Sequence, residues 1–353
     1  MQHPTVPIRG SQIREMHSDF TGHDYEIFVQ LPEGYEGSTQ TYPTLYILDG
    51  QWDFKLLDSV YGGLRYDRFV PEIMLVGISY GGTNPDFEAL RARDYSPVDH
   101  DGNGQFGGAD RFLHFLSAEL VPFVEREYRA DPADRAIGGH SFGGLFTFYA
   151  LFHAPELFTR HISISPAIGF CQDEMFRDEE AYAAKHDDLP VRVFAAMGSL
   201  ENKQHMIDPM VEMVRRLQER GYPSLHVDSL IVAGERHSGL KPEAYNRGLR
   251  AVFERPAATL SAEELDAVVG TYRWDEEDTD VVVERREKRL VCYTTKEPDD
   301  VDEIVPYSST EFRLASAPCD MAIEESSNGS ATRLRFSAPD GDSIMKRVGR
   351  SSA

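Results

Sequence analysis

The chain has 353 residues, and its 41% hydrophobic and 11% aromatic content excludes a disordered or low-complexity protein. Its 36 Lys and Arg residues are outnumbered by 59 Asp and Glu residues, and the formal net charge of −23 repels phosphate backbones and anionic lipid surfaces, so neither nucleic acid nor a membrane is expected as a partner. The length exceeds what one hydrophobic core usually supports, which predicts a large domain and a smaller one.

The N-terminal twenty residues lack the apolar segment of a secretory signal, and the chain contains no run of 18 apolar residues. Cys171, Cys292 and Cys319 lie far apart in the sequence and form no CxxC pair. Such cysteine usage is typical of a reducing compartment and not of a disulfide framework. We therefore expect a cytoplasmic protein with no membrane span.

Strand and helix patterns alternate along the first two thirds of the chain. Residues 24–51 contain two strand-like apolar runs separated by a Gly/Ser/Thr-rich turn, and residues 72–82 form a third run. Residues 107–128 have helical periodicity, and Pro122 within them predicts a kink or an early end. Short apolar strands between helices indicate an α/β domain with a mostly parallel sheet and helices on both faces. Further strands are expected within 135–139, 160–167, 191–199 and 225–235, and further helices within 142–158, 208–222 and 241–254.

The pattern changes after residue 255. Gly270, Thr271 and Tyr272 begin a series of short β-rich runs, and no further long helix is indicated. We therefore predict an α/β domain over residues 1–255 and a small antiparallel β domain over residues 258–353, with the joint near Pro256.

Residues 139–143 read Gly-His-Ser-Phe-Gly, a G-x-S-x-G sequence between an expected strand and an expected helix. In this context the serine lies in a strained turn, and the glycines let neighbouring backbone approach without Cβ clashes. The turn presents the Ser141 hydroxyl at the carboxyl ends of the strands, where the helix N-terminus behind it stabilises developing negative charge. The alternative is a Gly-rich helix start in which Ser141 only caps the helix.

A nucleophilic serine needs a histidine as base and usually a carboxylate that orients the histidine, and with this turn the chain order is Ser, acid, His. His237 follows an apolar strand and precedes a helix, so we expect it to be the base. Glu201 is the first carboxylate after the strand at 191–199, and we favour it as the acid. Asp208 is an alternative, although Asp208-Pro209 is typical of a helix N-cap; a Ser–His pair without a direct acid is the third option.

An oxyanion hole needs two backbone N–H groups aimed at the developing charge. Phe142, directly after the serine, is expected to supply one, and the turn with Gly50 and Gln51 is expected to supply the other through Gln51. An ordinary strand-ending turn is the alternative for the latter segment. No metal-ligand cluster or phosphate-binding glycine loop accompanies these residues, so neither a metal nor a cofactor is expected.

At these positions the sequence resembles the esterase family of the α/β hydrolases that includes esterase D and the enterochelin and bacillibactin esterases. The resemblance covers residues 20–254 and implies an α/β-hydrolase fold with Ser141 as nucleophile and His237 as base. It also implies that the loop with Glu201 is the acid region and that the turn after Asp49 is the oxyanion loop. The segments that carry it include YPTLYILDGQ, RARDYSP, AIGGHSFGGLFTFYALFHAPELF, SISPA, MGSLEN and GERHSG.

One departure concerns the wall expected beside the substrate. After the SPA turn many relatives carry a pair of tryptophans, whereas this chain has Ile-Gly-Phe ending at Phe170, which predicts a less aromatic and wider wall. Gly50, Arg93 and Phe170 are our candidates for substrate binding. Arg91 and Arg93 suit an anionic substrate, and an Arg93–Asp94 ion pair is the structural alternative.

These residues predict a serine hydrolase that cleaves carboxylic esters of small molecules through an acyl-enzyme. We favour a siderophore-type lactone or a related multi-ester, with a feruloyl or other aryl-acyl ester and a thioester as alternatives. A rival of another class is a binding protein on the same fold that has lost turnover. The domain at 258–353 loosely resembles small β-barrel appendages of serine hydrolases; we favour an accessory role without chemistry, against capping of the site, homodimer contacts or ligand binding.

Overall fold

The computed structural model describes residues 7–100 and 102–349. The chain divides into two compact units, one formed by Met1–Gly62 with Pro71–Phe253 and the other by Gly63–Val70 with Glu254–Ala353. The division after Phe253 lies beside the joint expected near Pro256. The inclusion of the short segment Gly63–Val70 in the smaller unit was not expected from the sequence.

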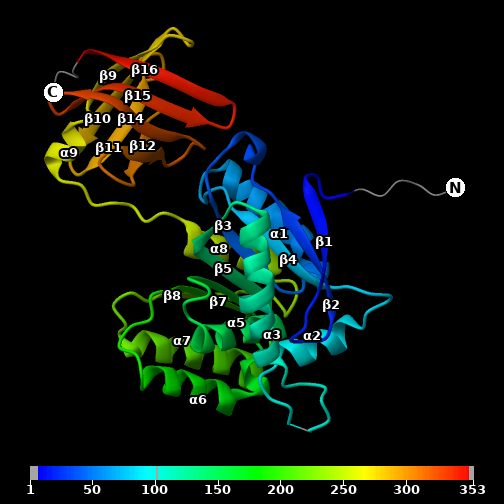
Figure 1. Cartoon of the computed structure of the whole chain (residues 1–353). Helices are drawn as coiled ribbons and strands as arrows, with labels where there is room; N and C mark the ends of the chain where they lie inside the picture. Colours follow the sequence, from blue (N-terminus) through cyan, green and yellow to red (C-terminus); the bar gives the residue numbers. More distant parts are fainter. Residues whose placement is uncertain (1–6, 101, 350–353) are drawn as a thin grey trace. The chain divides into compact units, whose positions relative to one another are not determined.

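The larger unit is built on an eight-stranded sheet with the order β1-β2-β4-β3-β5-β6-β7-β8 (Figure 1). The pairs β1-β2 and β2-β4 are antiparallel, whereas all pairs from β4 to β8 are parallel. The expected mostly parallel sheet is therefore confirmed. The strands are β1 Ser11–His17, β2 Asp24–Gln30, β3 Tyr42–Ile47, β4 Met74–Tyr80, β5 Ala130–His140, β6 Arg160–Ile164, β7 Arg192–Gly198 and β8 His226–Val232.

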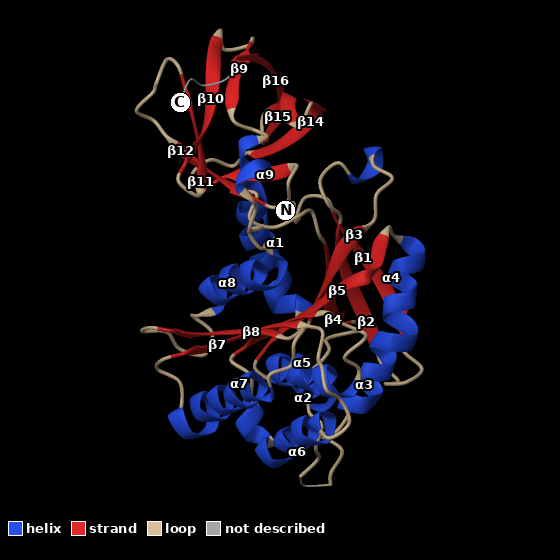
Figure 2. Ribbon diagram, turned by 90° about the vertical axis from the view of Figure 1, so that its left-hand side faces the viewer, coloured by secondary structure: helices blue, strands red, loops and turns tan. Residues whose placement is uncertain are grey.

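Helices cover both faces of this sheet. In Figure 2, α1 and α8 lie on one face and α5, α6 and α7 on the other. Because the central strands are covered on both sides, every residue of β4 is buried, whereas the edge strand β8 is largely exposed. The helices are α1 Gly50–Tyr66, α2 Phe87–Tyr95, α3 Ala109–Phe115, α4 Val121–Glu127, α5 Phe142–His153, α6 Gln172–Ala183, α7 Asp208–Arg220 and α8 Lys241–Phe253, with short 3-10 or π turns at Tyr35–Gly37, Leu116–Leu120, Ile168–Phe170 and Lys203–Ile207.

The helical segment around Pro122 continues through the proline. The chain passes from α3 into a π-helical turn at Leu116–Leu120 and then into α4, whose second residue is Pro122. A proline lacks the N–H that an α-helix interior requires, and a π turn directly before it is a known way to absorb that loss. Of the two alternatives predicted at Pro122, a kink or an early end, the early end is wrong.

The turn from β5 into α5 is formed by close backbone packing. A Cβ atom at Gly139 would lie 2.6 Å from the carbonyl carbon of Gly143, and a Cβ atom at Gly144 would lie 2.8 Å from the carbonyl oxygen of Ile164. Both distances are shorter than real Cβ contacts, so the glycines are required by the packing of helix on strand. Ser141 lies between them with φ 63° and ψ −117°, a conformation that side chains rarely adopt.

The smaller unit is a closed antiparallel barrel. Its strands follow one another in chain order, and β9 pairs with both β10 and β16 to complete the ring. The expected small antiparallel β domain is therefore confirmed as an up-and-down barrel. The strands are β9 Gly270–Trp274, β10 Thr279–Arg286, β11 Arg289–Thr294, β12 Asp302–Pro306, β13 Glu311–Leu314, β14 Asp320–Ser327, β15 Ser330–Ala338 and β16 Gly341–Gly349.

One end of the barrel is filled by a short helix, α9 (Ala262–Asp266), and the residues after it. Leu265 and Val268 are buried in the same apolar cluster as Tyr272 of β9. Arg347 of β16 donates to the Tyr272 hydroxyl at 2.7 Å and to backbone carbonyls of the segment that follows α9. These contacts hold the helix across the barrel end.

The packing at Gly139 predicts opposite effects for two Gly→Ala substitutions. Gly139→Ala is expected to lower the free energy of unfolding by at least about 2 kcal/mol, because the added methyl overlaps backbone that cannot move independently. Gly62→Ala, in the interior of α1 with open space around it, is expected to raise that free energy by about 0.5–1 kcal/mol. Urea titrations followed by circular dichroism measure both. Equal effects of the two changes would contradict the packing argument.

Candidate active site

Ser141 lies at the junction of strand β5 and helix α5, at the carboxyl edge of the parallel sheet. Its backbone N–H donates to the carbonyl of Ile164 at the end of the neighbouring strand β6, and its carbonyl accepts from the N–H of Ala167 at 3.1 Å. These bonds fix the residue in its left-handed conformation. The strained turn predicted from the G-x-S-x-G sequence is thus present, and its strain is compensated by hydrogen bonds on both sides.

His237 and Glu201 meet at the same edge of the sheet. His237 lies in the loop between β8 and α8, and its Nδ1 lies 2.7 Å from Glu201 Oε2. Glu201 follows β7, and its other oxygen accepts from the Ser165 hydroxyl at 2.5 Å and from the Gly198 N–H at 2.8 Å. The carboxylate is 3% exposed, so its orientation is set by these three donors.

The hydrogen bonds also determine the charge of Glu201. Burial by itself raises the pKa of this carboxyl, but the bonds from His237, Ser165 and the Gly198 N–H together lower it below its usual value. Glu201 is therefore an anion near neutral pH and an acceptor for the imidazole. Ser165 was not singled out from the sequence, although it lies in the SISPA segment.

Asp208, the alternative acid, lies elsewhere. Its carboxylate is half exposed and pairs with Lys203 at 2.5 Å. The expected N-cap role of Asp208 is wrong, because helix precedes it: a π turn at Lys203–Ile207 runs directly into α7. Asn202 caps this longer helix by accepting from the His205 N–H.

A buried ion pair connects two strand ends at the site. Arg91 of α2 makes two 2.8 Å hydrogen bonds to the carboxylate of Asp49, the residue directly before α1, and a third at 3.1 Å to the carbonyl of His140, the last residue of β5. Burial lowers the pKa of the Arg91 guanidinium, but the Asp49 carboxylate raises it by more, so the guanidinium stays charged. Arg91 is thus bound within the protein and holds the residue before Ser141.

Arg93 is bound as well. Its guanidinium donates to Asp94 at 2.6 and 3.0 Å, and Asp94 also accepts from the Tyr25 hydroxyl. The Arg93–Asp94 pair that was the structural alternative is present. The substrate contact of Arg93 stays a prediction.

His140 contacts the loop that carries His237. Its Nε2 lies 2.5 Å from the His237 backbone carbonyl, and the two imidazole rings are 4.4 Å apart. Burial, together with the positive charge of Lys241 and the neighbouring His237, lowers the pKa of His140 to about 2. The ring is therefore neutral, and because a carbonyl only accepts, Nε2 must carry the proton. The contact, between residues far apart in the sequence, was not predicted.

The two expected oxyanion donors lie at the starts of two helices that follow neighbouring strands. Phe142 is the first residue of α5 and Gln51 the second of α1, and the first N–H groups of a helix have no acceptor within it. The helices follow β5 and β3, which are adjacent and parallel. Gly50 has a packing role, since a Cβ atom there would lie 2.9 Å from the carbonyl carbon of Gly77. The substrate contact of Gly50 stays a prediction.

Aromatic rings gather beside Ser141. The Phe170 ring lies 5.0 Å from Phe142 and 4.9 Å from Phe106, and Phe142 also lies 5.7 Å from the Arg91 guanidinium. The wall expected to be less aromatic therefore receives an aromatic ring from another loop, that of Phe106. This contact was not predictable from the sequence, because Phe106 lies in a Gly-rich loop without periodicity.

Two kinds of feature are absent from the described residues. Among them, no group of three or more His, Cys, Asp or Glu side chains is arranged to hold a metal ion. In the same part of the chain, no helix is both long and apolar enough to cross a membrane.

Comparison with known proteins identifies one family, and the similar proteins and solved structures include esterases and a serine hydrolase. The family model described as "Putative esterase" matches residues 18–230. The chain is 28% identical over 274 residues to the ferri-bacillibactin esterase BesA of Bacillus subtilis. The aligned region covers 73% of this chain and 93% of that protein. The crystal structure of the BES protein from Bacillus cereus has a TM-score of 0.64 at 25% identity, with 71% of this chain and 97% of that chain covered. An IroE-like serine hydrolase from Shewanella oneidensis has a TM-score of 0.60 at 26% identity, covering 68% and 79%.

The Asp49–Arg91 pair predicts a large effect of removing one partner. Arg91→Met leaves the Asp49 carboxylate buried and unpaired, and we expect the free energy of unfolding to fall by about 3–5 kcal/mol in urea titrations. Asp49→Asn combined with Arg91→Met leaves no unpaired charge and should recover part of that loss. A double variant less stable than Arg91→Met would show that the pair itself is not the cause.

The buried neutral His140 predicts a loss of stability on acidification. Its pKa is depressed in the folded state, so below pH 6.5 the unfolded chain binds one more proton and stability falls by about 1.4 kcal/mol per pH unit from this group. His140→Gln should remove that contribution between pH 6.5 and 4.5, whereas His226→Gln, at an exposed position, should not. Urea titrations across this range measure the difference in slope; unchanged slopes in His140→Gln would contradict the assignment.

Proposed function

The chain belongs to the family described as "Putative esterase" and is an ester hydrolase. We propose that Ser141, His237 and Glu201 carry out the hydrolysis. The observation that supports this best is the 2.7 Å contact between His237 Nδ1 and a buried, anionic Glu201 at the sheet edge where Ser141 occupies its strained turn. A nucleophile, a base and an orienting acid are the three groups that acyl transfer requires.

In this proposal each residue has one task. Glu201 accepts the Nδ1–H of His237, which leaves Nε2 unprotonated and able to take the proton of the Ser141 hydroxyl. Ser141 Oγ then attacks the ester carbonyl, and the tetrahedral intermediate collapses to an acyl-enzyme as His237 protonates the leaving alcohol. Water, deprotonated by the same imidazole, attacks the acyl-enzyme, the bond between the acyl carbon and Ser141 Oγ breaks, and the carboxylic acid leaves as His237 returns the proton to Oγ.

The developing oxyanion is bound by backbone N–H groups. We assign Phe142 and Gln51 to this role, because they begin helices that follow adjacent parallel strands. The Arg91–Asp49 pair keeps the two helix starts together, and the neutral His140 holds the His237 loop through its carbonyl. Both act as positioning residues and not in the reaction itself.

For the substrate we propose an ester-linked siderophore. The Bacillus subtilis relative is by its name a ferri-bacillibactin esterase, and it matches this chain over nearly its own full length. The aromatic cluster of Phe106, Phe142 and Phe170 beside Ser141 suits acyl groups that are aromatic or apolar.

We also propose a cytoplasmic location, which the three buried free cysteines support. The homodimer stays a prediction, which light scattering of the purified protein tests.

The triad predicts a graded series of activity losses. With a p-nitrophenyl ester, Ser141→Ala and His237→Ala should lower kcat by about 10⁴-fold or more, and Glu201→Gln by about 10²–10⁴-fold. Asp208→Asn is the matched control and should stay within twofold of wild type, since its carboxylate pairs with Lys203 at the surface. A large loss in Asp208→Asn with an active Glu201→Gln would reassign the acid.

The substrate class is tested with a panel of a ferric trilactone siderophore, a feruloyl ester and p-nitrophenyl esters. We expect the siderophore to have the highest kcat/KM. A preference for the feruloyl ester would favour the aryl-acyl alternative, and no turnover of any ester by folded wild type would favour a binding protein.

A further inference from the structure

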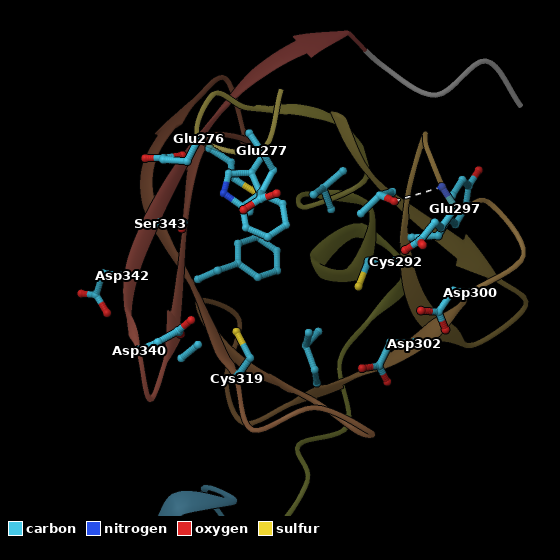
Figure 3. A pocket seen from close by; sticks show the side chains of 18 of the residues that line it. Glu276, Glu277, Cys292, Glu297, Asp300, Asp302, Cys319, Asp340, Asp342 and Ser343 are labelled. Atoms are coloured by element: carbon cyan, nitrogen blue, oxygen red, sulfur yellow. Dashed lines mark hydrogen bonds between the residues drawn. The ribbon is translucent and has the colours of Figure 1, made fainter. Parts of the chain in front are cut away.

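The barrel encloses a cavity at the end opposite to α9. The cavity has a volume of about 490 Å³, within the range of small-molecule sites, and Figure 3 shows it in the ring of strands. An eight-stranded barrel is just wide enough either to be filled by its own side chains or to hold one small ligand. Here α9 and its neighbours fill one end, and the other end is left hollow.

The inner wall of the cavity is apolar. Val281, Phe336 and Met345 are buried side chains that line it, together with Cys292 and Cys319. Burial raises the pKa of Cys292 to about 12 and that of Cys319 to about 11, so both thiols stay protonated. They act as small apolar groups and not as nucleophiles or metal ligands.

The mouth of the cavity is acidic. Of the nineteen residues that line the cavity seven are Asp or Glu, and none is Lys or Arg. In Figure 3, Glu297, Asp300 and Asp302 lie on one side of the opening and Glu276, Asp340 and Asp342 on the other. The carboxylates lie in the loops that join β9 to β10, β11 to β12 and β15 to β16, or at the first residues of β12 and β16, which an up-and-down barrel brings to the same end.

These carboxylates are mostly uncompensated. Among the described residues, Asp342 is the one of the seven with an ion pair, at 3.6 Å from Arg335. Lys296, beside the mouth, donates to the backbone carbonyl of Glu277 and not to a carboxylate. Elsewhere in the barrel acidic side chains do have arginine partners, for example Asp266 with Arg285. Seven carboxylates with so few positive charges near them attract a cation.

The cation is not expected to be a metal ion. The carboxylates surround the opening, and no three His, Cys, Asp or Glu side chains converge as metal ligands in the described part of the chain. A metal ion needs such converging oxygen ligands, whereas an organic cation is held by a diffuse negative field together with apolar contact.

Trp274 adds a specific contact. It lies on β9 two residues after the buried Tyr272, so both side chains point into the barrel, and Trp274 lines the cavity. Its indole Nε1 is buried and has no hydrogen-bond partner among the described residues. The ring face of an indole attracts a cation. The unpaired N–H needs an acceptor, which an ammonium group cannot supply, so it is open to an acceptor atom elsewhere in a ligand and does not itself select a cation.

We propose that the barrel cavity binds a small amphipathic organic cation, with its apolar body against Phe336, Met345 and Trp274 and its ammonium or guanidinium group between the carboxylates at the mouth. This makes the barrel a second binding site, separate from ester hydrolysis and independent of the function proposed for Ser141. Anionic amphiphiles such as fatty acids are excluded from it by the charge of the mouth.

Fluorescence of Trp274 tests the proposal. The chain has two tryptophans, so Trp52→Phe leaves Trp274 as the single reporter. This variant is titrated with octylammonium, octanol and octanoate, which share a tail and differ in charge. We expect octylammonium to bind at least about tenfold more tightly than octanoate and more tightly than octanol, with an affinity that falls as salt is added. Equal or tighter binding of octanoate or octanol would overturn the charge assignment, and no binding of any probe would overturn the site.

Variants in the same background locate the binding. Asp300→Asn with Asp340→Asn, both at the mouth, should weaken octylammonium binding about three- to tenfold. The control, Asp299→Asn with Glu287→Gln, changes the charge equally at residues that do not line the cavity and should stay within twofold. Equal weakening by both pairs would indicate general attraction to an acidic protein and overturn the site.

A third variant fills the cavity. Ser343 lies on the inner face of β16 directly opposite Phe336, so Ser343→Phe is expected to abolish binding of octylammonium. Circular dichroism checks that the barrel is folded, and Ala338→Leu, near the mouth, serves in its place if it is not. Unchanged binding in a folded, filled variant would contradict the proposal.

Discussion

The buried ion pair between Asp49 and Arg91 is the interaction that joins the parts of the candidate active site. Parallel strands end at a common edge, but nothing in the sheet itself sets how the loops beyond the strands lie. Arg91 joins the end of β3 to the end of β5 through Asp49 and the His140 carbonyl. A second buried carboxylate, Asp53 of α1, accepts from Lys241 and Tyr245 of α8, the helix that follows His237. The loops of the site are thus joined to each other by charge, in a place where water does not compete.

Much of this arrangement could be predicted from the sequence, wherever a local sequence pattern marks a strand or a motif. Strands β3 to β7 were predicted because buried strands carry continuous apolar runs, and the less buried β2 and β8 because their sequences alternate in, or end on, apolar residues. Ser141, His237 and Glu201 became candidates because one motif sets the chain order of the other two. The edge strand β1 was missed, since only partly buried positions leave no apolar alternation. Helix α1 was missed because Gly62 and Gly63 weaken its helical pattern.

The contacts that orient the site could not be read in the same way. His140 and His237 are 97 positions apart, and Asp49 and Arg91 are 42 apart. Each of these residues has an ordinary local context, and its partner is determined by how strands and helices pack. The same holds for Phe106, which reaches Phe142 and Phe170 from a loop without periodicity. The composition likewise did not predict the acidic opening of the barrel. The net charge of −23 belongs to the whole chain and does not show which carboxylates are paired and which surround an opening.

The topology of the barrel has a consequence for how this part of the chain folds. From β9 to β16 each strand pairs with the next one in the sequence, and the exception is the closing pair, in which Arg273 lies opposite Lys346. The meander can therefore form through local hairpins, which are kinetically accessible, while ring closure must wait for the last strand. Arg347, next to that closing pair, donates hydrogen bonds to the segment after α9. Pairing of the last strand with β9 and packing of α9 across the barrel end are therefore coupled in one late step.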